Sequence, residues 1–234
     1  MATIALPDSH ADHHYTSTGQ THTKIAIWAF IGSECFFFAS LISTYLIYKG
    51  RSVVGPFPHE WWCSTTSQIG FCAGESASHY VNSMKPILNI PVTSASTFVL
   101  LMSSLFMVLA LAAVENKGKP GYQGKLLGNS SFWLMATAIA GATFLGFQAY
   151  EFTSFVHEGL TIKTNLFGSS FFTLTGFHGA HVSAGVLWLL TLLAIDMKRG
   201  LQPKDALLVD ISALYWHFVD VVWIAIFTLV YLIR

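Results

Sequence analysis

LFGSSFFTLTGFHGAHVSAGVLWLLTLLAI, residues 166–195, is a mostly apolar stretch that is long enough to cross a membrane as one helix. A helix rises about 1.5 Å per residue, so roughly 20 residues cross a hydrocarbon layer about 30 Å thick. Four further stretches meet this requirement: Ile25 to Tyr48, Pro91 to Val114, Ser131 to Phe155 and Ala206 to Ile233. Lipid cannot hydrogen-bond the backbone, and the stretches lack the alternation of barrel strands. The sequence therefore predicts an all-α, polytopic membrane bundle with five transmembrane helices.

The composition favours the same class of protein. Hydrophobic residues make up 53% of the 234 residues and charged residues 10%, with a mean hydropathy of +0.54. A soluble domain carries about 25% charged residues, so this chain lacks the polar surface of a soluble globule. The 12 basic and 12 acidic residues cancel, so no positive field attracts nucleic acid, and a nucleic-acid partner is not expected.

The chain divides into a tail and a membrane unit. Residues 1–23 are predicted to be a polar cytoplasmic tail, and residues 24–234 to be the five-helix unit with an outer loop at 50–88. The tail holds His10, His13, His14 and His22. A solvated, disordered tail is favoured over a weak metal site, because nothing fixes ligand geometry.

Basic residues in two loops predict the orientation. These loops fall on one side of a five-helix bundle and hold Lys117, Lys119 and Lys125, and Lys198, Arg199 and Lys204. Because cytoplasmic loops are enriched in Lys and Arg, the N-terminus is predicted to be cytoplasmic and the C-terminus outside.

The outer loop contains two cysteines, Cys63 and Cys72, on the oxidising side in this orientation. A disulfide between them is one expectation and two free thiols the other. A zinc site that adds His59 and His79 is disfavoured, because the usual spacings of zinc ligands are absent.

Ionisable residues within the apolar stretches are the candidate site residues, since a charge at membrane depth is costly without a partner. Glu34 lies in IGSECFFFAS and is expected to be either a neutral, hydrogen-bonded acid or part of a proton-handling network. Three pairs spaced three residues apart share a helix face and are expected to be structural polar pairs. They are Gln148 with Glu151, His178 with His181, and His217 with Asp220. An imidazole one turn from a carboxylate can donate a ring N–H to it.

The histidines also allow a different interpretation. A haem between two helices needs axial ligands from both, and His178, His181 and His217 could provide them, although the spacing favours hydrogen-bonded packing histidines. The paired Glu-x-x-His segments of a di-metal bundle are absent, so no metal site is predicted. Small residues such as Gly141, Gly146, Gly176 and Gly179 recur at helical spacing and indicate close helix packing.

Four segments together resemble subunit III of the haem-copper cytochrome c oxidases. They are SECFFFAS, FQAYEF, FGSSFFTLTGFHGAHV and YWHFVDVVWIAIFTLVYLIR, and the resemblance covers residues 24–234. It implies a five-helix accessory subunit of a proton-pumping terminal oxidase in the bacterial plasma membrane. Such a subunit has no catalytic residue and binds no haem or copper, which belong to its partners.

The resemblance also implies roles and partners. The subunit stabilises subunit I and supports its proton uptake during reduction of O2 to water. Its expected partners are subunit I, subunit II, a small subunit IV and membrane lipids, with structural phospholipid bound. Glu34 matches the carbodiimide-reactive glutamate of the family. Longer members have two more N-terminal helices that form one wall of a lipid cleft, and here a polar tail stands in their place.

The residues are also compatible with three alternatives. A haem-copper quinol oxidase uses the same helices with a different electron donor. A five-helix haem b anchor would use the histidines as ligands. An independent proton-coupled transporter would use Glu34 as its carrier, although the internal repeat and broken helices typical of such proteins are missing.

Overall fold

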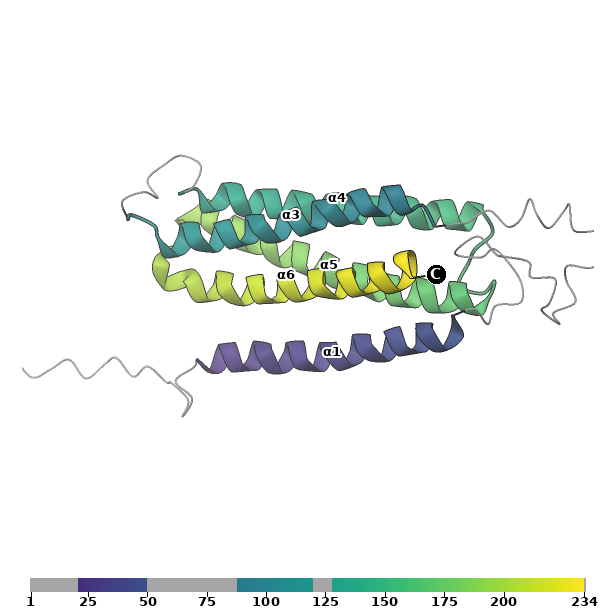
Figure 1. Cartoon of the computed structure of the whole chain (residues 1–234). Coiled ribbons are helices and arrows are strands. Elements are labelled where there is room, and N and C mark those ends of the chain that lie inside the picture. Colours follow the sequence, from purple (N-terminus) through teal and green to yellow (C-terminus); the bar gives the residue numbers. More distant parts are fainter. Residues whose placement is uncertain (1–20, 50–87, 120–127, 234) are drawn as a thin grey trace, which may run out of the picture.

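Five helices in the computed structural model are long and apolar enough to cross a membrane. The structure describes residues 21–49, 88–119 and 128–233. The helices are α1 (His22–Tyr48), α3 (Ile90–Glu115), α4 (Ser130–His157), α5 (Leu166–Arg199), and a last span that joins η1 (Pro203–Asp205), α6 (Ala206–Ile226) and η2 (Phe227–Leu232). Successive spans run in alternate directions (Figure 1). The predicted five-helix membrane bundle is confirmed.

Asparagine caps set where three of the spans begin. The side chains of Asn89, Asn129 and Asn165 accept hydrogen bonds from backbone N–H groups in the first turns of α3, α4 and α5. Such a cap satisfies a donor that has no partner within the helix. At the other end of α5, Gly200 takes a φ of 70°, which a residue with a side chain adopts at a steric cost. The helix therefore ends four residues beyond the predicted Ile195.

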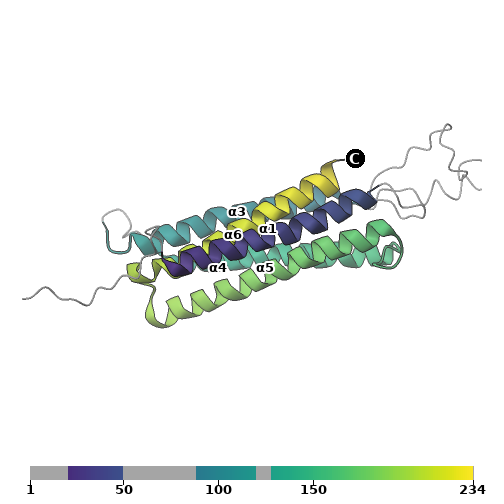
Figure 2. The same cartoon turned by 90° about the horizontal axis from the view of Figure 1, so that it is seen from below.

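The last span lies at the centre of the bundle. It contacts α1, α3 and α5, while α4 packs against α3 and α5 (Figures 1 and 2). Among the described elements, α1 contacts only α5 and α6, and it is the least buried of the five spans. The four-helix part α3 to α6 is thus the packed core, and α1 lies along one side of it.

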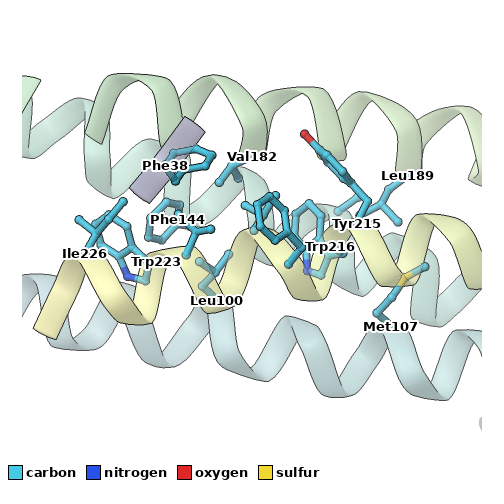
Figure 3. Packing of buried hydrophobic residues seen from close by; sticks show 14 of the residues in the cluster. Phe38, Leu100, Met107, Phe144, Val182, Leu189, Tyr215, Trp216, Trp223 and Ile226 are labelled. Atoms are coloured by element: carbon cyan, nitrogen blue, oxygen red, sulfur yellow. The ribbon is translucent and has the colours of Figure 1, made fainter. Parts of the chain in front are cut away.

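Two tryptophans of α6, Trp216 and Trp223, fill the centre of the core (Figure 3). Each indole N–H needs a buried acceptor. Ser103 accepts from Trp216 at 2.9 Å, and Thr97 accepts from Trp223 at 2.9 Å. Both acceptors are hydroxyls of α3, so these bonds fix the rotation of α6 relative to α3.

Glycines let α4 and α5 approach Trp216 from two sides. A Cβ on Gly141 of α4 would lie 2.5 Å from the indole, and a Cβ on Gly185 of α5 would lie 2.8 Å from it. Gly146 and Gly176, which belong to the same stripes of small residues, have open space where a Cβ would stand. Close packing therefore depends on particular glycines and not on the whole stripe.

Asp196 joins three segments at the end of the bundle where α5 ends. Its carboxylate accepts hydrogen bonds from Ser130 at 2.6 Å, from Ser131 at 2.7 Å and from the backbone N–H of Leu201 at 2.7 Å. The Lys117 ammonium donates to the carbonyl of Leu201 at 2.7 Å. These bonds tie the ends of α3, α4 and α5 together.

Lys49 follows the C-terminal end of α1 and bonds that end to the last span. Its ammonium donates to the carbonyl of Ile233 at 2.5 Å and lies 3.5 Å from that of Leu229, so a cation meets the C-terminal carbonyls of the last span. Partial burial lowers the pKa of Lys49. At the other end of α1, an ion pair of 2.6 Å joins Lys24 to Asp210 of α6.

Candidate functional site

The Glu34 carboxyl meets the His181 imidazole between α1 and α5. Glu34 Oε2 lies 3.2 Å from His181 Nε2, and the two side chains keep 20% and 18% of their exposure. The His181 ring also packs edge-on against Phe38, with ring centroids 5.0 Å apart. A carboxyl near the middle of α1 is thus paired with an imidazole from another helix.

The other nitrogen of His181 determines what the pair can do. Nδ1 lies 2.7 Å from the carbonyl oxygen of Phe177, which can only accept, so Nδ1 carries a proton. Nε2 then either accepts a hydrogen bond from the O–H of neutral Glu34 or, when the ring is cationic, donates a hydrogen bond to the Glu34 carboxylate. Both states hold a single proton between the two atoms and have no net charge. The arrangement can therefore hold and pass a proton at low cost in lipid.

His178 lies in a different environment from His181, although the two share a helix. It is fully buried, stacked on Trp223 at 4.9 Å and edge-on to Phe144 at 5.7 Å. Neither ring nitrogen has a hydrogen-bond partner within the described part of the chain. His178 is a packing residue of the α4, α5 and α6 core, and it does not contact Glu34.

Gln148 and Glu151 also bond to different neighbours. The amide of Gln148 donates to the backbone carbonyl of Thr175 on α5 at 2.7 Å. Glu151 is bonded to the Thr93 hydroxyl of α3 at 2.7 Å and accepts from the Tyr231 hydroxyl of η2 at 3.0 Å. The predicted pair therefore holds α4 against three other elements.

A serine of α3 lies between His217 and Asp220. Ser104 Oγ is 3.0 Å from His217 Nδ1 and donates to Asp220 Oδ2, while no direct hydrogen bond between the imidazole and the carboxylate occurs among the described residues. The ring N–H thus reaches Asp220 through a hydroxyl group, and the set joins α6 to α3.

Hydroxyl groups are the partners that sequence reasoning missed. Thr93, Thr97, Ser103 and Ser104 all come from α3, and each bonds to a tryptophan or an ionisable residue of another helix. Their signal in the sequence is weak, because a serine or threonine in a helix also bonds to its own backbone, as Thr97 does.

The three histidines do not converge on a common space. His181 faces Glu34 of α1, His217 faces Ser104 of α3, and His178 is enclosed by aromatic rings. A haem needs two axial ligands that approach one iron from opposite sides. The positions of these side chains therefore do not fit the haem b anchor. Within the residues that the structure describes, no group of three His, Cys, Asp or Glu side chains is placed to hold a metal ion.

Several predicted residues lie outside the described residues. These are Cys63 and Cys72 of the expected disulfide, His59 and His79 of the disfavoured zinc site, and His10, His13 and His14 of the tail. His22, the last tail histidine, is the first residue of α1.

The bundle and its polar contacts define a class of protein: a multi-pass membrane chain in which Glu34, Glu151 and Asp220 are each hydrogen-bonded to a side chain of another helix. The family model described as cytochrome c oxidase subunit III matches residues 5–233. The chain belongs to this family of haem-copper oxidase subunits, so it is a subunit of the terminal oxidase complexes of respiratory chains.

Relatives come from both branches of the family. The chain is 38% identical over 208 residues to cytochrome c oxidase subunit 3 of Bacillus sp. (strain PS3), covering 89% of this chain and 84% of that protein. It is 33% identical over 225 residues to quinol oxidase subunit 3 of Bacillus subtilis (strain 168), covering 96% and 94%. It is also 33% identical over 230 residues to cytochrome bo(3) ubiquinol oxidase subunit 3 of Pseudomonas aeruginosa, covering 97% and 94%.

Proposed function

We propose that this chain is the accessory third subunit of a proton-pumping cytochrome c oxidase, in which it stabilises subunit I and supports proton uptake there. Haem and copper belong to the partner subunits, and the chain itself has no active site. The observation that carries this proposal is the Glu34–His181 pair within a chain of this family. A neutral pair that shares one proton suits a subunit that handles protons without performing redox chemistry.

The second candidate function is the same role in a quinol oxidase. The match to two quinol oxidase subunits extends over 94% of each of them, against 84% of the cytochrome c oxidase subunit from Bacillus sp. (strain PS3). Identity favours the cytochrome c type, at 38% against 33%. The electron donor separates the two functions, and it is read directly from the activity of the purified complex.

Subunits I and II, a small subunit IV and membrane lipids are the proposed partners. Because α1 packs only on α5 and α6 among the described elements, much of its surface is free for a partner or lipid. A groove between α1 and α5, with a volume of about 240 Å³, is lined by apolar and hydroxyl side chains that include Leu41 and Thr173. Structural phospholipid is the proposed occupant of such a groove.

The proposed location is the bacterial plasma membrane, with the N-terminus cytoplasmic and the C-terminus outside. Residues 1–23 are proposed as a cytoplasmic tail attached to the membrane unit at 24–234. Single cysteines placed next to each terminus, probed with an impermeant thiol reagent on intact cells, test this orientation. Labelling at the N-terminal position with protection at the C-terminus would reverse it.

Copurification tests the main proposal. A tag on this chain is expected to bring down a haem-containing partner that reduces O2, and oxidation of reduced cytochrome c against oxidation of a quinol then identifies the donor. A chain that purifies alone from membranes that contain an active oxidase would contradict an accessory role.

Carbodiimide labelling tests the assignment of Glu34. A hydrophobic carbodiimide reacts with a protonated carboxyl group, so Glu34 is expected to be modified in the complex and Glu34→Gln to abolish that modification. In the same complex, Glu34→Gln is expected to slow proton uptake while the haem spectrum stays unchanged. A shifted haem spectrum with unchanged proton uptake would place Glu34 in a different role.

A further inference from the structure

Glu151 is a buried acid that lies where α4 ends and α3 begins. It keeps 7% of its exposure, and none of the ion pairs among the described residues involves it. Its two oxygens instead meet hydroxyl groups of other elements, Thr93 Oγ1 at 2.7 Å and the Tyr231 hydroxyl at 3.0 Å. An acid without a cationic partner in lipid is costly unless both of its protonation states are hydrogen-bonded.

The hydrogen-bond partners of Thr93 satisfy Glu151 in both states. The Thr93 hydroxyl lies 2.7 Å from Glu151 Oε1 and 3.0 Å from the carbonyl oxygen of Asn89, but it has one proton to donate. When Glu151 is an anion, Thr93 donates to Oε1 and Tyr231 donates to Oε2. When Glu151 is neutral, its own O–H donates to Thr93, whose proton turns to Asn89.

The change between the two states needs no movement of heavy atoms. A rotation of one hydroxyl hydrogen is sufficient, and the Asn89 carbonyl keeps the helical bond from the backbone N–H of Thr93 at 3.1 Å in either state. Glu34 is arranged differently, since its proton is shared with an imidazole. Glu151 is thus a separate group that can gain and lose a proton.

A cavity of about 330 Å³ connects this region to the surface of the bundle. It is lined by residues 88–92 around the start of α3 and by side chains near the end of α4, among them Glu151 and Ser154. This volume is enough for several water molecules at about 30 Å³ each. A proton that leaves Glu151 therefore has a polar route out of the bundle.

The ionisable groups around Glu151 are few. Tyr231 comes from η2, and Tyr45 of α1 lies near Tyr231. Tyr150 of α4 and Glu158, the residue after α4, line the same cavity, and the Lys49 ammonium donates to the carbonyl oxygen of Ile233, the residue after η2. Both α3 and α5 face this region with hydroxyl and aromatic side chains.

We infer that Glu151 is a proton-exchange site, which exchanges protons with water in the cavity between α3 and α4. The Thr93 hydroxyl acts as a switch: it donates a hydrogen bond to ionised Glu151 and accepts one from neutral Glu151. The site is separate from the Glu34–His181 pair and opens at the end of the bundle where α3 begins.

Infrared spectroscopy of the tagged complex tests this inference. The difference between the spectra of the unmodified protein and Glu151→Gln isolates the carbonyl band of protonated Glu151. That band is expected to shift within minutes in D2O and to disappear reversibly as the pH rises. A band that stays unshifted in D2O overnight, or that is absent at every pH, would overturn the inference.

Variants of α3 test the role of the hydroxyl group. Thr93→Val keeps the shape of the side chain but removes a donor to the anion, so the acid band is expected to persist at pH values where the unmodified protein has lost it. Ser96→Ala is the matched control, because Ser96 is buried one turn away and bonds to a backbone carbonyl. Equal pH dependence in Thr93→Val and the control would refute the switch.

A measurement on the unmodified protein removes any dependence on folding of the variants. A water-soluble carbodiimide, followed by peptide mass spectrometry, is expected to modify Glu151 at low pH and to leave it unmodified at high pH. Modification of Glu158 alone at every pH would contradict access through the cavity. The Glu151 band is expected to remain in Glu34→Gln, so failure of this site is distinguishable from failure of the proposed function.

Discussion

The packing of Trp216 between two glycines predicts that two apparently similar Gly→Ala substitutions differ in their effect on stability. Gly185 of α5 lies against the indole, where a Cβ would be 2.8 and 2.9 Å from two ring carbons. Gly146 of α4 has no atom within 4 Å of the point where its Cβ would stand. Gly185→Ala is therefore the perturbation, and Gly146→Ala is the matched control.

The loss of stability in Gly185→Ala depends on how tightly the neighbouring residues hold the indole of Trp216. Carbon atoms pack at about 3.5 to 4.0 Å, so the ring would have to move by more than roughly half an ångström. Gly141 lies against the ring from α4, and Ser103 holds the indole N–H at 2.9 Å. Overpacking of this kind costs about 1 to 3 kcal/mol, and a disturbed hydrogen bond costs about 1 kcal/mol more.

The gain from a helical alanine works in the opposite direction. Replacing glycine by alanine within a helix stabilises it by up to about 1 kcal/mol, and this gain applies to both variants. Gly185→Ala is therefore expected to lower the free energy of unfolding by about 1 to 3 kcal/mol, whereas Gly146→Ala leaves it unchanged or slightly raised.

The assay is reversible unfolding in mixed detergent micelles. The free energy of unfolding of each variant is obtained by linear extrapolation. Gly141→Ala, which approaches the same indole from α4, is expected to resemble Gly185→Ala. If Gly185→Ala proves as stable as Gly146→Ala, the close contact at Trp216 does not limit the packing of α5 on α6, and the reasoning is wrong.

Three further predictions concern polar contacts. Ser104→Ala removes the hydroxyl between His217 and Asp220, so the free energy of unfolding is expected to fall by about 1 to 3 kcal/mol in the same assay, and an unchanged value would show that the bridge is dispensable. Asn165→Ala removes the N-terminal cap of α5 and is expected to cost about 1 kcal/mol, measured as a lower thermal midpoint; no change would mean that water replaces the cap. Lys24→Gln breaks an ion pair whose side chains are partly exposed, at 30% and 25%, and is expected to cost less than about 1 kcal/mol, with a smaller difference from the unmodified protein at high salt; a larger loss that salt leaves unchanged would indicate a buried role.

Much of the fold is predictable from the sequence because the membrane allows few solutions. The stretch of residues 166–195 requires a helix, since any other conformation leaves backbone groups without hydrogen bonds in lipid. The same argument gives all five spans, with errors of a few residues at the ends. The errors arise where caps decide, as at the start of α1, where Thr21 accepts from the backbone N–H of Lys24 and the helix begins at His22.

The candidate site is predictable only as a set of residues. Glu34, Glu151 and Asp220 stand out in the sequence because an acid in an apolar helix demands a partner. The partners of Glu151 and Asp220 do not stand out, since Thr93 and Ser104 look like any hydroxyl residue that bonds to its own helix.

By itself the sequence determined the number of spans and the buried groups that need partners, because the cost of exposing backbone and charge to lipid depends on composition along one helix. Only the tertiary structure decided which partners those groups have. Side chains three residues apart differ by about 60° in direction around a helix axis, enough to face different neighbours in a bundle. For that reason His181 reaches Glu34 of α1 while His178 is enclosed by the rings of α4 and α6.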